Sequence, residues 1–472
     1  MDAFVKSLVQ IVGQTGVLTE PADLDAFVID GRGRYKGDAV CVAQPRSTEE
    51  VAAVVALCIE HSVPIQPQGG NTSLCGGSVP FPGERGVVLS LSRMRRIRSI
   101  DAANNSITVE AGCVLADVQR AAVDAGRFYA VSLGAEGSCQ IGGNIATNAG
   151  GTGVLRYGNT RENVLGLEVV LPDATIWHGL RGLRKDNTGF DLKHLFIGSE
   201  GLLGVITAAT LKLHPLNTRH IAAWLAPANI DAAVELLALF QSSLGTRLTA
   251  FEIMNSAHVH NVLALAPGQQ IPLDPACPWH VLAELGDASA DDELRSGLEN
   301  LLQSALSRGL LSDAAVSSNE AQRAAMWKIR HSVTEATQKA GRGISHDIAV
   351  PVSKIPDFVR RVGPVLERRF AGIQIVIVGH LGDGNLHFIP LFGFDAWRAF
   401  PDEQTVIDEV HRLTYSVATE LGGTFSAEHG IGRYLVAEMR QYKSEVELSL
   451  MRSIKLALDP RGLFNPAKVI PQ

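Results

Sequence analysis

Three glycine-rich segments in the first half of the chain constrain its fold more than any other feature. They span residues 67–77, 134–153 and 198–207, and the first directly follows a strand-like run. Glycine permits positive φ and close approach to the backbone, at a cost in chain entropy. Packing in a hydrophobic core does not offset the entropy cost of so many glycines. We therefore expect backbone-lined loops around an extended, phosphate-containing ligand. The first segment by itself is equally compatible with a tight turn.

The composition is that of a globular protein with two large domains or about three smaller ones. The chain has 472 residues, of which 46% are hydrophobic and 19% charged, and a domain commonly has about 100 to 200 residues. The net charge of −7 argues against a nucleic-acid-binding protein, which neutralises phosphates with basic side chains. We expect small molecules or proteins as partners.

Neither export nor membrane insertion is expected. Residues 1–14 lack the basic cluster, apolar core and cleavage site of a signal peptide. No run approaches the roughly 18 apolar residues of a transmembrane helix. The six cysteines are scattered without a C-x-x-C pair, which favours reduced thiols. The expected location is the cytoplasm.

Strand and helix patterns alternate up to a domain boundary near Pro215. A capping box predicts a helix over residues 47–62, and glycine ends a second predicted helix over 115–126. Strands are predicted at 86–91, 106–111 and 202–213, with a hairpin formed by 167–171 and 175–178. Beyond the boundary, periodicity predicts helices over 230–243, 291–307, 319–340, 403–421 and 444–458, and strands at 280–285, 347–352 and 374–378. This pattern indicates an α+β fold with an antiparallel sheet.

A candidate metal site lies in the last quarter of the chain. His380 and His387 flank a glycine-rich turn, and Glu428 follows downstream. Two imidazoles and a carboxylate form the N, N, O donor set of a catalytic divalent-metal site, which suits zinc and leaves manganese and iron open. Either histidine taken alone is more often an ordinary polar residue than a ligand.

Candidate catalytic and substrate-binding residues accompany these ligands. His429, next to Glu428, has a reference pKa near 6.5 and is suited to act as a general base. On the helix predicted over 319–340, Arg330 and Thr334 are four residues apart and therefore share a face. Arg330 is suited to clamp a carboxylate with two hydrogen bonds. The alternative is a solvated arginine on a helix surface.

These motifs, together with the tail over residues 458–468, resemble one family over essentially the whole chain. The chain resembles the flavin-dependent D-2-hydroxyacid dehydrogenases of the vanillyl-alcohol-oxidase-type superfamily, which include the D-lactate, D-2-hydroxyglutarate and glycolate dehydrogenases. The resemblance implies an α+β chain with a two-subdomain PCMH-type FAD-binding domain over 1–215. A substrate or cap domain with an antiparallel sheet would follow over 216–424. A C-terminal helical segment over 425–472 would complete the active site and the flavin contacts.

The resemblance also assigns residues to FAD. No histidine lies in the first two glycine-rich loops, where some relatives attach flavin covalently, so noncovalent FAD is expected. By position, the FAD contacts would be Gly69, Gly70, Asn71, Thr72 and Ser73 at the pyrophosphate, Ser132, Gly134, Gly137, Ser138, Gly143, Asn144, Thr147, Gly151 and Gly153 along the second loop, Ile206 near the adenosine, and Asn465 near the isoalloxazine.

The implied reaction is oxidation of a D-2-hydroxyacid to its 2-oxoacid. His380, His387 and Glu428 would hold the metal, Arg330 and Thr334 the substrate, and His429 would take the hydroxyl proton as hydride passes to flavin N5. A separate acceptor would reoxidise the flavin, with an electron-transfer flavoprotein, a quinone and a cytochrome all open. Two other classes stay open: a metal hydrolase, and a flavin-binding subunit without substrate oxidation. The oligomeric state is open as well, with a homodimer among the options.

Two departures from the hydroxyglutarate pattern bear on the substrate. Ser345 stands where those relatives usually have lysine, and Ile389 where they tend to have asparagine. Both changes remove polar anchors, which favours a smaller or more apolar tail such as that of D-lactate. The spacing of Arg330 and Thr334 resembles that in the D-2-hydroxyglutarate-type relatives. Lys339 or Arg342 could replace the missing lysine. The sequence therefore leaves a D-lactate-like and a D-2-hydroxyglutarate-like substrate open.

Overall fold

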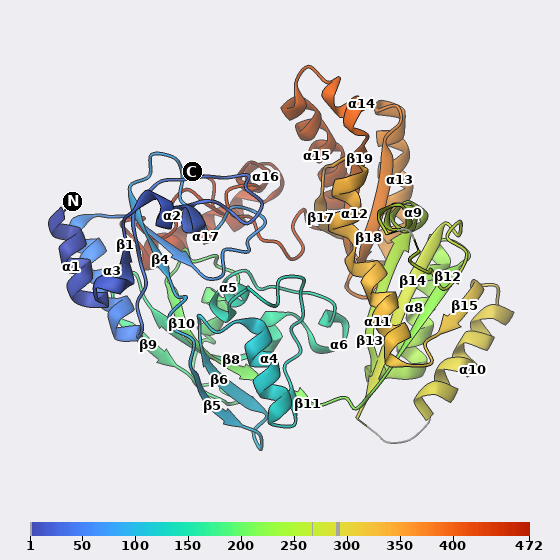
Figure 1. Ribbon diagram of the computed structural model, residues 1–472, viewed down its shortest axis with the longest axis horizontal. Helices are drawn as coiled ribbons and strands as arrows, with labels where there is room; N and C mark the ends of the chain where they lie inside the picture. The colour runs from blue at the N-terminus through green and yellow to red at the C-terminus, as the bar shows by residue number, and fades with distance from the viewer. Residues whose placement is uncertain (1, 267, 289–292) are drawn as a thin grey trace. The chain divides into compact units, whose positions relative to one another are not determined.

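The computed structural model describes residues 2–266, 268–288 and 293–472, which divide into two compact units (Figure 1). The first unit comprises Met1–Gly151, Gly158–Leu216 and Glu428–Gln472, and the second comprises Thr152–Tyr157 and Asn217–Ala427. Each unit combines helices with mainly antiparallel sheets, so the predicted α+β class is confirmed.

The first unit contains a four-stranded sheet in the order β1-β2-β4-β3. Its three longer strands run parallel and are largely buried, while β1 joins antiparallel at the edge. The strands are β1 (Val17–Leu18), β2 (Ala39–Ala43), β3 (Ile65–Gln68) and β4 (Gly86–Ser90), and the helices beside them are α1 (Asp2–Val12), α2 (Pro21–Val28) and α3 (Thr48–His61). The predicted start of α3 is confirmed, because Ser47 Oγ accepts a hydrogen bond from the Glu50 N–H.

A second sheet in this unit is antiparallel, in the order β5-β6-β10-β8-β9. It is formed by β5 (Ile97–Asp101), β6 (Ser106–Glu110), β8 (Val164–Val170), β9 (Ile176–Gly179) and β10 (Val205–Lys212), with β7 (Arg127–Phe128) and β11 (His214–Pro215) forming a separate pair. The helices are α4 (Leu115–Asp124), α5 (Ile141–Ala146) and α7 (Lys193–Phe196). One hydrophobic core joins both sheets, and α3 contributes to it Val51, Val54 and Val55, all with no exposed surface. The predicted hairpin is confirmed as β8 and β9.

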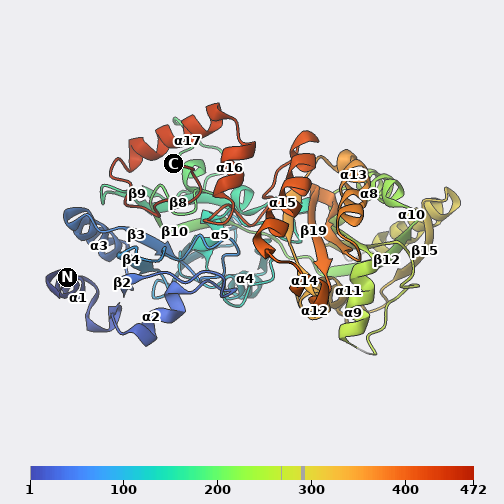
Figure 2. The same ribbon diagram turned by 90° about the horizontal axis from the view of Figure 1, so that it is seen from above.

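The C-terminal segment returns to the unit that begins the chain, where α16 (Val436–Tyr442) and α17 (Glu445–Leu458) lie (Figure 2). Lys455 Nζ of α17 donates a 2.7 Å hydrogen bond to the Leu202 carbonyl. Further on, the Ile65 N–H donates to the Leu463 carbonyl at 2.8 Å, which attaches the tail to β3. The end of the chain is thus an integral part of this unit.

The second unit is organised around an eight-stranded antiparallel sheet in the order β15-β12-β14-β13-β18-β19-β16, with β17 also paired to β19. The strands are β12 (Arg219–Pro227), β13 (Leu248–Asn255), β14 (Trp279–Asp287), β15 (Leu311–Val316), β16 (Arg342–Gly343), β17 (His346–Ala349), β18 (Gln374–His380) and β19 (Asn385–Phe392). The predicted antiparallel sheet is therefore confirmed.

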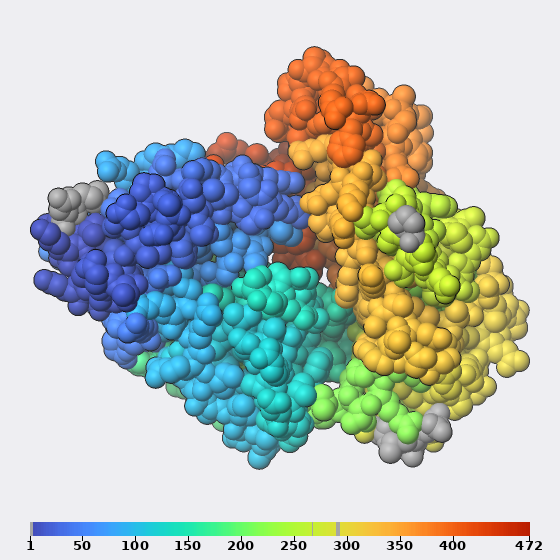
Figure 3. Space-filling model, viewed as in Figure 1, coloured from blue at the N-terminus to red at the C-terminus, as the bar shows by residue number. Residues whose placement is uncertain are grey.

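Helices cover both faces of this sheet. On one face α9 (Ser256–Leu265), α11 (Glu320–His331) and α12 (Val333–Ala340) share a core with β12, β13, β14, β18 and β19, and they hide that face in the space-filling view (Figure 3). On the other face, Phe240 packs on Phe251 and Phe358 on Phe388. The remaining helices are α6 (Val154–Tyr157), α8 (Ile230–Leu244), α10 (Glu293–Ser307), α13 (Ile355–Arg369), α14 (Phe394–Arg398) and α15 (Glu403–Glu420).

The single helix predicted over 319–340 is wrong, because the helix breaks at Ser332. Ser332 has ψ of 3° and separates α11 from α12. Its Oγ donates a 2.7 Å hydrogen bond to the Lys328 carbonyl four residues back. Such back-bonding competes with the helical ladder and bends helices. Of the predicted helix over 291–307, residues 291 and 292 lie outside the described residues.

All six cysteines lie in the described part of the chain and are free thiols, five of them buried. None of the helices within residues 2–266, 268–288 and 293–472 combines the length and apolarity needed to cross a bilayer.

Candidate functional site

Strand pairing in the second unit brings the two predicted histidine ligands together. His387 on β19 pairs with Val378 on β18, two residues before His380, and residues two apart on a strand share one face. The rings of His380 and His387 lie 5.6 Å apart between centroids, at 80°. The turn between them needs glycine, since Gly384 has φ of +84° and a Cβ there would lie 2.2 Å from the Val350 carbonyl oxygen.

Sequence reasoning missed Asp347, which lies beside this pair. It is opposite His387 across β17 and β19, and its Oδ1 lies 3.9 Å from His387 Nδ1. Oδ1 also accepts a 2.8 Å hydrogen bond from Asn385 Nδ2, and Oδ2 accepts one from the Ala427 N–H at 3.2 Å. The signal in the sequence was an aspartate within a predicted strand, between His346 and Ile348, which are both buried in the structure.

Sequence reasoning also missed Glu252, the carboxylate that joins His380 to Arg330. Glu252 Oε1 lies 2.8 Å from His380 Nδ1, and Oε2 lies 2.8 Å from Arg330 Nε. Burial alone would raise the pKa of Glu252, but the nearby His380 and Arg330 hold that pKa below its ordinary value. The signal was a single charged residue in the mainly apolar strand Leu248–Asn255.

Arg330 is buried, which excludes the alternative of a solvated helix arginine. It is 4% exposed, and its Nη2 has no hydrogen-bond partner. A buried, unpaired guanidinium nitrogen is costly unless a ligand completes it. The residue is therefore suited to accept an anionic group.

Thr334 does not share this environment. The break at Ser332 places it on α12 rather than one turn further along α11, and its side chain is exposed. Thr334 and Arg330 therefore do not lie on one continuous helical face.

The positions that bear on the substrate tail are mostly at the surface. Ser345 is exposed, Lys339 forms an exposed ion pair with Glu335, and Arg342 lies over the Trp397 ring at 5.7 Å. Ile389, in contrast, is 5% exposed in the core of the second unit.

Glu428 and His429 follow directly on the second unit's last residue. Ala427 is fixed to β17, because its N–H donates a 3.0 Å hydrogen bond to the Asp347 carbonyl. Within the first unit, His429 Nε2 lies 3.6 Å from Glu428 Oε1, and both side chains are partly exposed. The segment that carries both residues thus begins beside the strand that carries Asp347.

In the first unit, the first two glycine-rich loops meet backbone to backbone. A Cβ at Gly70 would lie 2.1 Å from the Ser138 carbonyl oxygen, and one at Gly151 would lie 1.8 Å from the Ser132 carbonyl oxygen. Gly69 lies against Gly143, because a Cβ placed at Gly69 would lie 3.5 Å from the Gly143 nitrogen. Only glycine fits at Gly70 and Gly151, so part of the glycine content serves the fold itself.

Other positions of the second loop show features expected of a ligand cradle. A Cβ at Gly134, Gly137 or Gly143 would meet nothing within 4 Å. The buried Oε1 of Gln140 has no hydrogen-bond partner, and neither has the buried Nδ2 of Asn144. Open space beside unsatisfied buried polar atoms fits a polar ligand such as FAD.

Most predicted polar side chains of these loops already bond to other groups of the first unit, inside or outside the loops. Asn71 Nδ2 donates to the Ile29 carbonyl at 2.7 Å. Hydroxyl groups bond locally at Ser73, Ser132, Ser138 and Thr147. Contacts with a ligand would therefore come mainly from backbone N–H groups. Of the other predicted contacts, Thr72 is partly buried, Ile206 is buried on β10, and Gly153 belongs to the short segment of the second unit.

The third glycine-rich loop is tied to the C-terminal segment. Glu200 accepts hydrogen bonds from the N–H groups of Ile431 at 2.7 Å and Gly432 at 2.8 Å, and burial raises its pKa. The Glu200 carbonyl accepts from Asn465 Nδ2 at 2.6 Å, while Asn465 Oδ1 accepts from Gln66 and Lys468. Asn465 thus uses its amide within the unit, so any flavin contact would come from its backbone.

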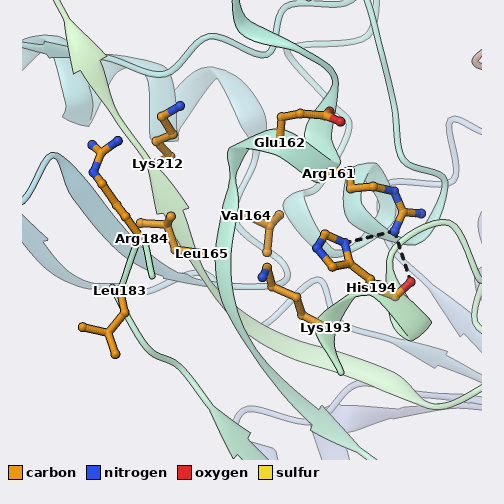
Figure 4. Close-up of a pocket in the computed structure, with 9 residues that line it drawn as sticks. All are labelled: Arg161, Glu162, Val164, Leu165, Leu183, Arg184, Lys193, His194 and Lys212. Carbon is orange, nitrogen blue, oxygen red and sulfur yellow. Dashed lines mark hydrogen bonds between the residues drawn. The ribbon is translucent and has the colours of Figure 1, made fainter. Parts of the chain in front are cut away.

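A separate basic cavity of about 310 Å³ lies on the first unit and contains none of the predicted site residues (Figure 4). On one side of it, Arg161 donates hydrogen bonds to the ring and the carbonyl of His194. Its lining is Arg161, Glu162, Val164, Leu165, Leu183, Arg184, Lys193, His194 and Lys212.

Two known protein families match the chain. Residues 39–179 match the FAD binding domain family, and residues 217–469 match the family of FAD linked oxidases, C-terminal domain. Among solved structures, p-cresol methylhydroxylase is similar with a TM-score of 0.75 at 16% identity, covering 99% of this chain and 96% of that one. At this identity the likeness concerns the fold alone.

Curated relatives are similar over almost the full length. D-2-hydroxyglutarate dehydrogenase of Xanthomonas citri pv. viticola is 37% identical over 99% of this chain and 97% of its own. The mitochondrial D-2-hydroxyglutarate dehydrogenase of Rattus norvegicus is 36% identical over 96% of this chain and 82% of its own. With more than a third of its residues shared from end to end and an FAD-binding domain in place, the chain belongs to the FAD-linked D-2-hydroxyacid dehydrogenase family.

Proposed function

We propose that the protein oxidises a D-2-hydroxyacid to the 2-oxoacid with the help of a divalent metal ion and passes the electrons to a separate acceptor. The observation that carries the proposal is the group formed by the buried Arg330, Glu252 and His380 and the partly buried His387, in which Arg330 Nη2 has no partner. A site with a buried guanidinium and two imidazoles is suited to a carboxylate and a metal-bound oxygen ligand together.

In this proposal His380, His387 and Glu428 hold the metal ion, for which zinc is the first candidate. Their donors are two imidazole nitrogens and a carboxylate oxygen, the set used by catalytic zinc sites with an open position. A divalent cation held there would acidify the substrate's α-hydroxyl group. Asp347, beside His387, would orient that imidazole.

Arg330 would bind the substrate's 1-carboxylate, with Thr334 as a further predicted contact. Pairing Arg330 Nη2 with a carboxylate oxygen would remove the cost of an unsatisfied buried donor. His429 would accept the hydroxyl proton while the Cα hydrogen leaves as hydride. Noncovalently bound FAD would supply N5 as the hydride acceptor.

We further propose that residues 1–215 bind FAD, residues 216–424 bind substrate and metal, and residues 425–472 complete both sites. The FAD contacts would be the loop positions that the sequence predicts, with Gln140 and Asn144 contributing their unpaired polar atoms. The chain's match to the FAD binding domain family over residues 39–179 supports the first assignment. No observation favours a metal hydrolase, since that reaction would leave the FAD-binding loops without a role.

The substrate tail is proposed to be either D-2-hydroxyglutarate-like or D-lactate-like. The names of the relatives favour the dicarboxylate. Ile389 in the apolar core and Ser345 at the surface offer no cation for a second carboxylate. Lys339 and Arg342 are engaged with Glu335 and Trp397, which favours the smaller acid.

The test is the visible spectrum of the purified protein under anaerobic conditions, before and after adding each D-acid and its L-enantiomer. We expect one D-acid to bleach the flavin absorbance, and chelator treatment to abolish the bleaching. Bleaching that survives complete metal removal would contradict the metal-dependent mechanism. A flavin that neither acid reduces with metal present would contradict the proposed substrates. Adding a quinone, a cytochrome or an electron-transfer flavoprotein to the reduced enzyme would then identify the acceptor.

A further inference from the structure

One buried carboxylate connects two side chains to which the proposed function assigns different tasks. Glu252 accepts from His380 Nδ1 with one oxygen and from Arg330 Nε with the other, both at 2.8 Å. The side chains of Glu252, His380 and Arg330 are 1%, 9% and 5% exposed. In so buried a group, each hydrogen bond restricts the orientation of its partner.

The contact with Glu252 determines which nitrogen of His380 can bind a cation. An ionised carboxylate only accepts hydrogen bonds, so Nδ1 of His380 carries the proton in this pair. The nitrogen suited to ligation is then Nε2, which is on the far side of the ring. A histidine ligand whose other nitrogen donates to a carboxylate is fixed in its tautomer and ring orientation.

The second oxygen of Glu252 orients Arg330 in the same way. By engaging Nε, it fixes the plane of the guanidinium and leaves Nη2, which has no partner, for a ligand. Glu252 itself is held in the interior of the sheet, because β13 pairs with β14 on one side and β18 on the other. The anchor of both groups is therefore rigid.

We propose that Glu252 is a positioning residue that fixes His380 as a metal ligand and Arg330 as the carboxylate clamp in one common geometry. This inference rests on the proposed function. Because one carboxylate serves both groups, a change at Glu252 weakens metal binding and substrate binding together. Glutamine offers a single acceptor oxygen and cannot serve both donors. Aspartate keeps the charge but is one methylene shorter, so it reaches only one partner well.

The same sheet provides a matched control at Glu284 on β14. Glu284 is 9% exposed and accepts a hydrogen bond from Trp327 Nε1 at 2.8 Å. It also pairs with Arg323, which lies two turns before Arg330 on α11. Glu284→Gln thus weakens a partly buried glutamate–arginine pair on the same sheet, but one without a histidine.

The experiment measures Zn²⁺ binding by equilibrium dialysis of the FAD-loaded protein against buffered Zn²⁺, for the wild type, E252Q, E252D, E284Q and H380A. E252Q is expected to bind Zn²⁺ about 10- to 100-fold more weakly and to show a raised KM for the hydroxyacid at saturating Zn²⁺. E252D is expected to be intermediate. E284Q is expected to match the wild type in both measurements, and all variants should keep one FAD per chain.

The outcomes separate this inference from the proposed function. If H380A binds Zn²⁺ like the wild type, the metal site and the proposed function are both wrong. If H380A loses Zn²⁺ but folded E252Q binds it with wild-type affinity, only the role of Glu252 is overturned. If E252Q does not fold, E252D decides, and wild-type Zn²⁺ affinity with unchanged KM in E252D contradicts the inference. Equal weakening in E284Q would show a general effect of the sheet and would overturn it as well.

Discussion

Lys468 Nζ donates a 2.7 Å hydrogen bond to Oδ1 of Asn465, three residues earlier, in the interior of the first unit. The ammonium also donates to the Val79 carbonyl at 2.7 Å and to Gln66 Oε1. Burial lowers the pKa of Lys468 to about 7, whereas so many acceptor oxygens favour its protonated form. One side chain thus connects the C-terminal tail to residues on both sides of the first glycine-rich loop.

Lys468→Met is expected to destabilise the first unit by about 3 kcal/mol, because it leaves buried acceptors unsatisfied. FAD affinity should fall as well, since Asn465 and the loop after β3 lose a common support. Urea unfolding and FAD titration measure the two effects. Lys443→Met removes only a pair with Glu447 near the surface and serves as the control. Unchanged stability in K468M would show that this network is not needed.

Gly70→Ala and Gly134→Ala should separate folding from ligand binding in the glycine loops. A Cβ at Gly70 would clash with the Ser138 carbonyl oxygen, so G70A is expected to destabilise the unit by several kcal/mol, on the order of an overpacked core. A Cβ at Gly134 would meet open space, so G134A should fold with wild-type stability but bind FAD more weakly. Thermal melts and FAD content measure both. Wild-type FAD affinity in G134A would argue against a cofactor contact at Gly134.

His429→Asn tests the proposed base. The variant should retain FAD, because His429 is outside the glycine loops, while anaerobic flavin reduction by the D-hydroxyacid should slow by about 10² to 10⁴-fold. Stopped-flow absorbance at the flavin band measures the rate. Reduction at the wild-type rate would exclude His429 as the base.

Ser345→Lys tests the substrate tail. Ser345 is exposed, so lysine should be accommodated without loss of stability. If a second carboxylate binds near this position, S345K raises kcat/KM for D-2-hydroxyglutarate relative to D-lactate by roughly tenfold, the effect of an interaction worth about 1.4 kcal/mol. Steady-state kinetics with both acids measures the ratio. An unchanged ratio would place the tail elsewhere.

His258→Gln tests the acid sensitivity of the second unit. His258 on α9 has no exposed surface, its Nε2 lies 3.1 Å from the Ile329 carbonyl oxygen, and burial lowers its pKa to about 4. The unfolded chain, with a pKa near 6.5, binds the proton first as the pH falls. The free energy of unfolding should therefore decrease between pH 6.5 and 4, by at most about 1.4 kcal/mol per pH unit from this residue.

In H258Q that decrease should be smaller, whereas His260→Gln, at an exposed position on the same helix, should follow the wild type. Urea unfolding of the second unit at several pH values measures the slopes. Identical slopes in the wild type and H258Q would assign the acid sensitivity to other groups.

Local patterns predicted many elements but not their interruptions. The helix start at Ser47 and the turn between β8 and β9 are short-range signals, and both were confirmed, although the Glu50 side chain bonds to the Arg46 N–H rather than completing a capping box at Ser47. The break at Ser332 was not predicted, because a serine within a periodic helix pattern does not by itself show whether its hydroxyl bonds back to the helix backbone. Glu252 could not be predicted for a related reason: a single charge in a mainly apolar strand does not show its role until its partners, far away in the sequence, are known.

The sequence by itself determined the α+β class and the family, since ordered glycine motifs and a histidine pair are local patterns that can be recognised in the sequence alone. Only the tertiary structure decided that Arg330 is buried, that Asp347 lies beside His387, and that Glu252 joins Arg330 to His380. Strand register brings together residues up to 128 positions apart. Because that pairing depends on how whole strands align rather than on neighbouring residues, no local pattern could predict it.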